Sequence, residues 1–355
     1  MNTRDEIFSG TKEIDQKLDF DHNTLNEYIK SIIGNNVNIE EIKQFKGGQS
    51  NPTYYLKTNE NNYVLRRKPP GKLLPSAHAV DREYKIITAL GNTNVPVPKT
   101  FKYCEDENIV GTSFFLMQHV EGKIFWDLLL PELNTEERKK IYLSMNETIA
   151  KLHEVDFKKI GLADYGKYEN YMARQIHRWT KQYKDSETQN IPEIENLIAW
   201  LPENVPQDEE TSIVHGDFRL DNIIFDKESL EVKAILDWEL STLGSPIADF
   251  TYHMMAWRLP VEAKGLGILG ADLKKLNIPS EKEYAELYYQ KTGREKIENW
   301  DFFMAYNIFR LAGITQGIAG RVRDGTAASS QAKNYGDFVP ILGKLGWEIV
   351  EGIKS

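Results

Sequence analysis

Residues 213–226 read IVHGDFRLDNIIFD. An apolar run that predicts a strand leads into a polar loop, and a second apolar run leaves it. Within the loop, four residues separate Asp217 from Asn222. This is the spacing of the catalytic loop of kinases, in which the aspartate accepts the proton of the substrate hydroxyl and the asparagine binds magnesium.

A second acidic segment follows the loop. Residues 234–239 read AILDWE, and Asp237 lies fifteen residues after Asn222. An acidic residue at the end of an apolar strand matches the aspartate of the metal-binding Asp-Phe-Gly segment in protein kinases. Because magnesium prefers hard oxygen ligands, we predict Asn222 and Asp237 as metal ligands and Asp217 as the catalytic base.

Two other interpretations of the loop remain. A His-Gly-Asp sequence alone is compatible with an ordinary turn, although Asn222, the flanking strands and Asp237 favour the catalytic interpretation. A phosphohydrolase could use His215 and Asp217 as metal ligands, but further histidines at ligand spacing are missing from the sequence.

Three N-terminal segments extend the pattern: GQSNPTY at 48–54, YVLRRKPPGKLLPSAH at 63–78 and VDREY at 80–84. Together with the two later motifs, they resemble the aminoglycoside phosphotransferase family, whose relatives include choline kinases and protein kinases. The closer resemblance is to the kinase-like domain found alone in bacteria or fused to some acyl-CoA dehydrogenases. It covers residues 40 to 330 and implies the use of ATP and Mg²⁺.

The sequence pattern and the resemblance imply an α+β, protein-kinase-like bilobal fold. Residues 1–120 are expected to form a small, β-rich nucleotide-binding N-lobe, and residues 121–355 a larger, mainly helical C-lobe with the catalytic loop and the acceptor pocket. The expected strands are 39–45, 53–58, 63–68, 101–105 and 114–120, with a strand-rich patch at 212–238. The expected helices are 23–33, 79–90, 135–155, 171–184, 192–201, one from Pro246, 281–291, 301–322 and 331–349.

The resemblance also implies where the nucleotide binds. The phosphate-covering turn would contain Gly47, Gly48, Gln49 and Ser50, since glycine lets backbone N–H groups approach phosphate oxygens. Backbone groups near Gln118, His119 and Val120 would bond adenine. A plain hairpin turn and a plain buried strand are the alternatives for these two segments.

Kinases place a strand lysine on the nucleotide phosphates and pair it with a helix glutamate. Here the aligned strand residue is Arg66, and Glu83 in the next helix is its expected partner. Arginine is permanently charged and its planar fork suits phosphate, so we expect the same role. Solvated surface charges are the alternative. The basic run from Arg66 to Lys68, with Lys72, suggests a contact for further phosphates.

The acceptor site is expected among Arg258, Arg310 and Arg321, with Arg323 nearby, where family members form their acceptor pocket. These cations could hold an acidic substrate, or they could form ordinary salt bridges on helix surfaces. Asp249 is expected to be a buried acceptor near a helix start, and His119 and His253 are expected to pack.

The closer resemblance implies a small-molecule hydroxyl substrate, particularly a hydroxyacyl-CoA. An aminoglycoside or amino alcohol is the alternative acceptor, and a catalytically silent nucleotide-binding module is the alternative function.

The composition of the 355 residues restricts partners and location. The net charge of −9 argues against nucleic-acid binding, because an acidic chain repels a phosphate backbone. Cys104 is the single cysteine, which suggests a reducing compartment. No run approaches the ~20 apolar residues of a membrane helix, and residues 1–12 do not read as a signal peptide. We therefore expect a cytoplasmic location.

Overall fold

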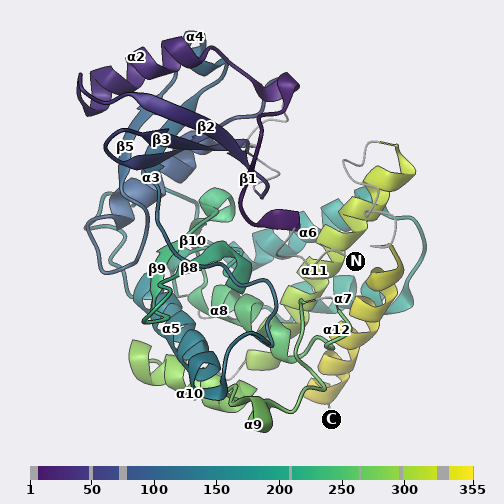
Figure 1. The fold of residues 1–355 in the computed structure, drawn as a ribbon. Coiled ribbons are helices and arrows are strands. Elements are labelled where there is room, and N and C mark those ends of the chain that lie inside the picture. The colour runs from purple at the N-terminus through teal and green to yellow at the C-terminus, as the bar shows by residue number, and fades with distance from the viewer. Residues whose placement is uncertain are drawn as a thin grey trace. The chain divides into compact units, whose positions relative to one another are not determined.

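The computed structural model describes residues 7–47, 51–71, 78–207, 210–263, 265–295, 299–325 and 336–354. The chain forms two compact units (Figure 1). The sheet unit comprises Met1–Ala163, Arg219–Ser241 and Asp272–Pro279. The helical unit comprises Asp164–Phe218, Thr242–Ala271 and Ser280–Ser355.

A six-stranded antiparallel sheet, ordered β1-β2-β3-β4-β6-β5, organises the sheet unit. Its strands are β1 (Thr11–Lys12), β2 (Ile39–Phe45), β3 (Thr53–Thr58), β4 (Asn62–Arg67), β5 (Thr100–Cys104) and β6 (Phe114–Gln118). Helices α2 (His22–Ile33), α3 (Val80–Leu90) and α4 (Glu107–Val110) accompany them. The hairpin of β8 (Ile223–Phe225) and β9 (Val232–Ile235) also belongs to this unit, with α5 (Thr135–His153) and α9 (Leu273–Leu276).

Side-chain alternation gives the sheet two different faces. Leu65 on β4 and Leu116 on β6 share a buried cluster with Leu25 and Ile29 of α2. Because successive side chains of a strand point to opposite faces, Arg66 lies on the other face, toward α3. This alternation explains how Leu65 can join the apolar cluster while the next residue of β4, Arg66, faces the charged side of the sheet.

The helical unit is built around α11 (Trp300–Arg323), a 24-residue helix with buried residues along most of its length. The other helices are α6 (Tyr171–Ser186), α7 (Pro192–Glu203), α8 (Pro246–Met254), α10 (Glu281–Thr292) and α12 (Val339–Lys354). Strands β7 (Ser212–Val214) and β10 (Thr242–Gly244) pair antiparallel. One apolar cluster joins α6, α7, α8, α11 and α12 and forms the core.

The expected succession of a β-rich region and a mainly helical region is confirmed. The first helix begins at His22, one residue before the predicted start, because Asp21 caps it: the Asp21 side chain accepts from the Asn23 N–H at 2.9 Å. The last helix begins at Val339 rather than at 331, and residues 331–335 of that prediction lie outside the described part of the chain. Strand β1 and helices α4 and α9 were not predicted, since segments of two to four residues carry little periodicity.

The lobe boundary near residue 120 stays a prediction. None of the helices in the described ranges combines the length and apolar character needed to cross a membrane.

Candidate active site

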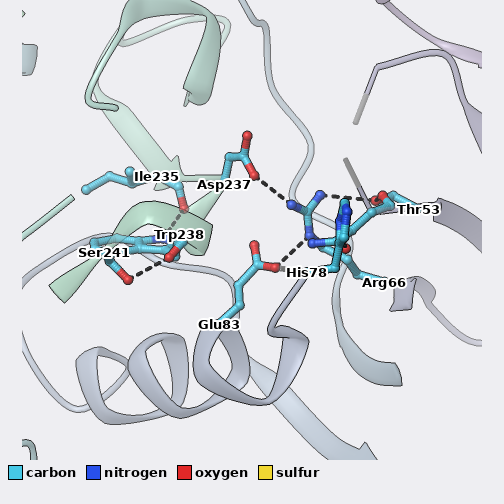
Figure 2. Close-up of polar contacts among 9 residues, drawn as sticks. Thr53, Arg66, His78, Glu83, Ile235, Asp237, Trp238 and Ser241 are labelled. Atoms are coloured by element: carbon cyan, nitrogen blue, oxygen red, sulfur yellow. Dashed lines mark hydrogen bonds and ion pairs between the residues drawn. The ribbon is translucent and has the colours of Figure 1, made fainter. Parts of the chain in front are cut away.

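Arg66 is the centre of a buried charge cluster in the sheet unit (Figure 2). Its Nε donates to Glu83 Oε2 at 2.7 Å, and its Nη2 donates to Asp237 Oδ1 at 2.6 Å. Its Nη1 donates to the hydroxyl of Thr53 at 3.2 Å, directly across the β3–β4 ladder. A strand, a helix and the end of a hairpin therefore each contribute to one guanidinium.

Within the cluster, ion pairing opposes the effect of burial on the pKa values of Arg66 and Glu83. Burial alone would lower the pKa of Arg66, but the charges of Glu83 and Asp237 raise it above its ordinary value. Burial raises the pKa of Glu83, and Arg66 opposes that change. A buried guanidinium flanked by carboxylates stays charged, so Arg66 is a fixed cation in the sheet unit.

The hairpin β8–β9 brings the two predicted metal ligands to the same end. Ile223 pairs with Ile235, and the Leu236 N–H donates to the Asn222 carbonyl at 2.8 Å. Asn222 thus directly precedes β8, and Asp237 lies two residues beyond β9. This register places the amide of Asn222 and the carboxylate of Asp237, which both offer oxygen ligands, at one end of the hairpin.

The backbone at Asp237 is held in an unusual conformation. Its φ of 64° and ψ of 60° lie in the left-handed region, which residues other than glycine rarely adopt. The following turn is fixed: the indole of buried Trp238 donates to the Ile235 carbonyl at 3.0 Å, and Ser241 Oγ donates to the Trp238 carbonyl at 2.6 Å (Figure 2). Such strain persists where the surroundings enforce it, and it clusters at functional sites.

The predicted catalytic loop begins in the helical unit, after β7. Asp249, in the first turn of α8, accepts the backbone N–H groups of His215 and Gly216 at 2.7 and 2.8 Å. Arg310 on α11 donates to the Gly216 carbonyl. Gly216 has a φ of 82°, which favours glycine at this point of the loop. The prediction of Asp249 as a buried structural acceptor is confirmed.

Asp217 itself receives a hydrogen bond from Tyr252 on α8. The phenol donates to Asp217 Oδ1 at 2.8 Å, and only 6% of Tyr252 is exposed. The sequence analysis missed Tyr252. Its position three residues after Asp249 could have indicated it, since residues three apart share one face of a helix.

The predicted adenine-contacting segment lies at the end of β6. The N–H groups of Gln118 and His119 already donate to the carbonyls of Lys99 and Asn62, at 2.8 and 3.2 Å. The His119 ring packs against Phe45 and Tyr55, as expected for a packing residue. Val120 follows the strand. An adenine contact here stays a prediction.

The phosphate-covering turn is described only at its start. Gly47 follows β2, while Gly48, Gln49 and Ser50 lie outside the described residues. Directly after them, Asn51 is fully buried and its Oδ1 contacts His78 Nδ1 at 3.1 Å. The role of this turn stays a prediction.

The arginines predicted for the acceptor site differ in environment. Arg258 donates to both carboxylate oxygens of Glu281, at 2.6 and 2.8 Å, and to Asp301 at 3.3 Å. Arg310 is 7% exposed and lies over the Tyr252 ring. Arg321 is exposed near the end of α11. These contacts favour a structural role for Arg258 and Arg310. Substrate binding by Arg258, Arg310 or Arg321 stays a prediction.

One expectation about the basic run is wrong. Arg67 does not offer its charge to a ligand, because it is 2% exposed and donates to the carbonyls of Val110 and Leu18. Alternation places Arg67 on the α2 face of the sheet, opposite to Arg66. Lys72 lies outside the described residues.

Residues 41–287 match the family model described as the phosphotransferase enzyme family. The chain belongs to this family. It is a phosphotransferase with an alcohol group as acceptor, and its fold is that of the kinase-like enzymes.

Relatives and solved structures agree with this assignment. Acyl-CoA dehydrogenase family member 10 of Mus musculus is 43% identical over 349 residues, covering 97% of this chain and 33% of that protein. The chain thus spans about a third of that relative. A candidate aminoglycoside phosphotransferase of Ralstonia eutropha is 45% identical, with a TM-score of 0.85 over 94% of this chain and 99% of that one.

A more distant structure shows the fold alone. The spectinomycin phosphotransferase solved with ADP and spectinomycin is 11% identical and has a TM-score of 0.62, covering 93% of this chain and 98% of that chain.

Proposed function

We propose that this phosphotransferase is an ATP- and Mg²⁺-dependent kinase that transfers the γ-phosphoryl group to a hydroxyl of a small molecule. The observation that carries the proposal is the buried cluster of Arg66, Glu83 and Asp237. It reproduces the pairing that kinases use to hold nucleotide phosphates, with arginine in place of lysine. In the more distant spectinomycin enzyme, ADP is the bound nucleotide.

The residues present fit a metal–nucleotide complex. Asn222 and Asp237 offer amide and carboxylate oxygens at one end of the hairpin, which are the hard donors that Mg²⁺ takes. Asp237 is a third exposed at its side chain, whereas Glu83 is 2% exposed. Asp237 is thus the carboxylate of the cluster that a ligand can reach. When bound, Mg²⁺ would neutralise charge on the phosphates.

The chain's own groups then have distinct tasks. Arg66 would bind phosphate oxygens through its Nη2 side, while Glu83 keeps the Nε side in place. Asn222 and Asp237 would hold the metal. Asp217 would accept the proton from the acceptor hydroxyl as the oxygen attacks the γ-phosphorus. Most of the rate enhancement would come from positioning and charge neutralisation.

For the acceptor, we propose a hydroxyacyl-CoA. The support is the 43% identity to a chain named as an acyl-CoA dehydrogenase family member, in which a kinase-like segment and an acyl-CoA enzyme would share one polypeptide. The basic run no longer supports this acceptor, since Arg67 is buried. An aminoglycoside is the second candidate, favoured by the naming of the Ralstonia eutropha protein as a candidate aminoglycoside phosphotransferase.

The test is an acceptor panel with purified protein, ATP and Mg²⁺. Hydroxyacyl-CoAs, aminoglycosides and amino alcohols are offered separately, and the phosphorylated product is identified by mass spectrometry. We expect product with a hydroxyacyl-CoA. Product with an aminoglycoside or amino alcohol alone would overturn the proposed acceptor.

A silent nucleotide-binding module is distinguished by the same panel. Thermal stabilisation by ATP, without ADP release in the presence or absence of any acceptor, would support the module and overturn the kinase.

A further inference from the structure

Tyr252, on α8 of the helical unit, contacts the side chain of the proposed catalytic base. Its hydroxyl donates to Asp217 Oδ1 at 2.8 Å, although the two residues are 35 positions apart. A carboxylate with one oxygen held in this way cannot rotate freely about its Cβ–Cγ bond. The direction of its lone pairs, which must meet the acceptor proton, is therefore set by α8.

Tyr252 is itself immobilised from two sides. It is 6% exposed and belongs to the apolar core cluster of the helical unit. The guanidinium of Arg310 lies 4.4 Å from its ring centroid, and the same guanidinium donates to the Gly216 carbonyl. One buried cation thus contacts both the phenol that holds Asp217 and the residue that precedes Asp217.

The N-terminal turn of α8 is hydrogen-bonded to the same loop. Asp249 accepts the N–H groups of His215 and Gly216, and Asn307 on α11 donates to Ala248 and Thr251 at 2.9 Å each. Helix α8 can therefore neither turn about its axis nor slide without breaking these bonds. The hydroxyl of Tyr252 is presented to Asp217 by a rigid support.

We propose that Tyr252 is a positioning residue for phosphoryl transfer: it fixes the orientation of the Asp217 carboxylate, and Arg310 holds Tyr252 and the loop in register. This inference rests on the proposed function of Asp217 as the base. It predicts a role in kcat rather than in substrate binding, because Tyr252 acts through Asp217.

The test compares two isosteric substitutions. Tyr252→Phe removes only the oxygen and keeps the ring beneath Arg310. The matched control is Tyr183→Phe on α6, which removes a buried phenol oxygen with no hydrogen-bond partner among the described residues. For each protein, kcat and the KM values for ATP and acceptor are measured, together with the thermal midpoint.

We expect Tyr252→Phe to lower kcat by about 10- to 100-fold, with both KM values within about 2-fold of the parent protein. Tyr183→Phe should keep the parent kcat. In the background of Asp217→Ala, Tyr252→Phe should cause no further loss of the residual rate, because the group it positions is gone.

Three results would overturn the inference, and they differ in what else they overturn. A Tyr252→Phe protein with the parent kcat, while Asp217→Ala is impaired, overturns the positioning role alone. An equal additional loss in the Asp217→Ala background also overturns it, since Tyr252 would then act independently of the base. A parent protein that phosphorylates no acceptor overturns the proposed function and the positioning role together.

Discussion

Two buried charged groups among the described residues, one around Arg66 and one around Asp249 and Arg310, are built in different ways. In the sheet unit, Arg66 forms ion pairs with the side chains of Glu83 and Asp237. In the helical unit, Asp249 accepts backbone N–H groups and Arg310 donates to a backbone carbonyl. Both charged side chains therefore bind the backbone of the catalytic loop rather than another charged side chain.

This difference suggests different roles: the Arg66 cluster would bind ligand, and the Asp249 and Arg310 contacts would hold the shape of the catalytic loop. A side-chain ion pair can exchange one partner for a ligand of the same charge while the backbone stays in place. A backbone-anchored charge cannot be exchanged without changing the shape of the loop. We therefore infer that the Arg66 cluster responds to nucleotide, whereas the Asp249 and Arg310 contacts persist throughout the reaction.

The largest effect is expected from Arg66→Met. It leaves Glu83 buried without its cation, and breaking a buried pair destabilises a protein by about 3–5 kcal/mol. The affinity for ATP should also fall by at least about 10-fold, because a phosphate contact is lost. Urea unfolding and calorimetric titration with ATP measure the two effects, with Lys57→Met at an exposed strand position as the control.

The double variant Arg66→Met/Glu83→Leu sharpens this prediction. Removing both charges should restore most of the stability while ATP binding stays weak. If the double variant recovers ATP binding, Arg66 is a structural cation and not a phosphate ligand.

The next effect is expected from Asp249→Asn. One of the two loop N–H groups would face an amide NH₂ instead of a carboxylate oxygen, which should reduce the free energy of unfolding by about 2–4 kcal/mol. Turnover should fall because the loop carrying Asp217 loses its anchor, while ATP affinity stays at the parent value. Asp185→Asn, at an exposed position of α6, is the control.

Nucleotide affinity decides this comparison. A large loss of ATP binding in Asp249→Asn would show that the Asp249 contacts to the loop and the Arg66 cluster do not act separately.

A smaller, pH-dependent effect is expected from His253. Burial lowers the pKa of His253 to about 4, so the native protein keeps this ring neutral at pH values where the unfolded chain, with a pKa near 6.5, binds a proton. Stability should therefore fall as the pH decreases from about 6.5 to 4, by up to about 3 kcal/mol from this group. Below pH 4, both states are protonated and the contribution levels off.

Urea unfolding at several pH values tests this. His253→Gln, which can still hydrogen-bond to Tyr284, should show a shallower fall between pH 6.5 and 4 than the parent protein. His22→Gln, at an exposed position, is measured in parallel as the matched His-to-Gln substitution. Equal slopes for the parent and His253→Gln would refute the assignment.

The smallest effect is expected from Arg258→Ala. Its partly exposed pairs with Glu281 and Asp301 should contribute no more than about 1 kcal/mol. Because both carboxylates already neutralise it, we expect the KM for the acceptor to stay within about 2-fold. A tenfold rise in that KM, absent from a Lys344→Ala control at an exposed position of α12, would instead support Arg258 as a substrate ligand.

The sequence predicted much of the sheet unit because local patterns decide it. Short strand-like runs, with a turn near residues 59–62, predicted β2, β3 and β4. The spacing of Asn222 and Asp237 predicted two oxygen donors, and the β8–β9 hairpin places both at one end. The pair of Arg66 with Glu83 was expected from the resemblance to kinases, which place a strand cation beside a helix glutamate.

Contacts between distant segments could not be predicted in this way. The bond from Tyr252 to Asp217 depends on how α8 packs against α11, and the pair of Arg66 with Asp237 joins residues 171 positions apart. Arg66 and Arg67 look equivalent in the sequence, yet alternation gives one to the charge cluster and the other to backbone carbonyls on the opposite face. Which face receives α2 and which receives α3 is a property of tertiary packing.

The central claim is that Asp217 performs chemistry while the Arg66 cluster performs binding. Asp217→Asn tests it most directly, because the amide keeps an oxygen that can accept the Tyr252 hydroxyl but cannot take up the acceptor proton. Binding of ATP with Mg²⁺ and single-turnover transfer are measured on the same protein. We predict parental ATP affinity with transfer slowed by about 100- to 10,000-fold. Transfer near the parental rate would contradict the account.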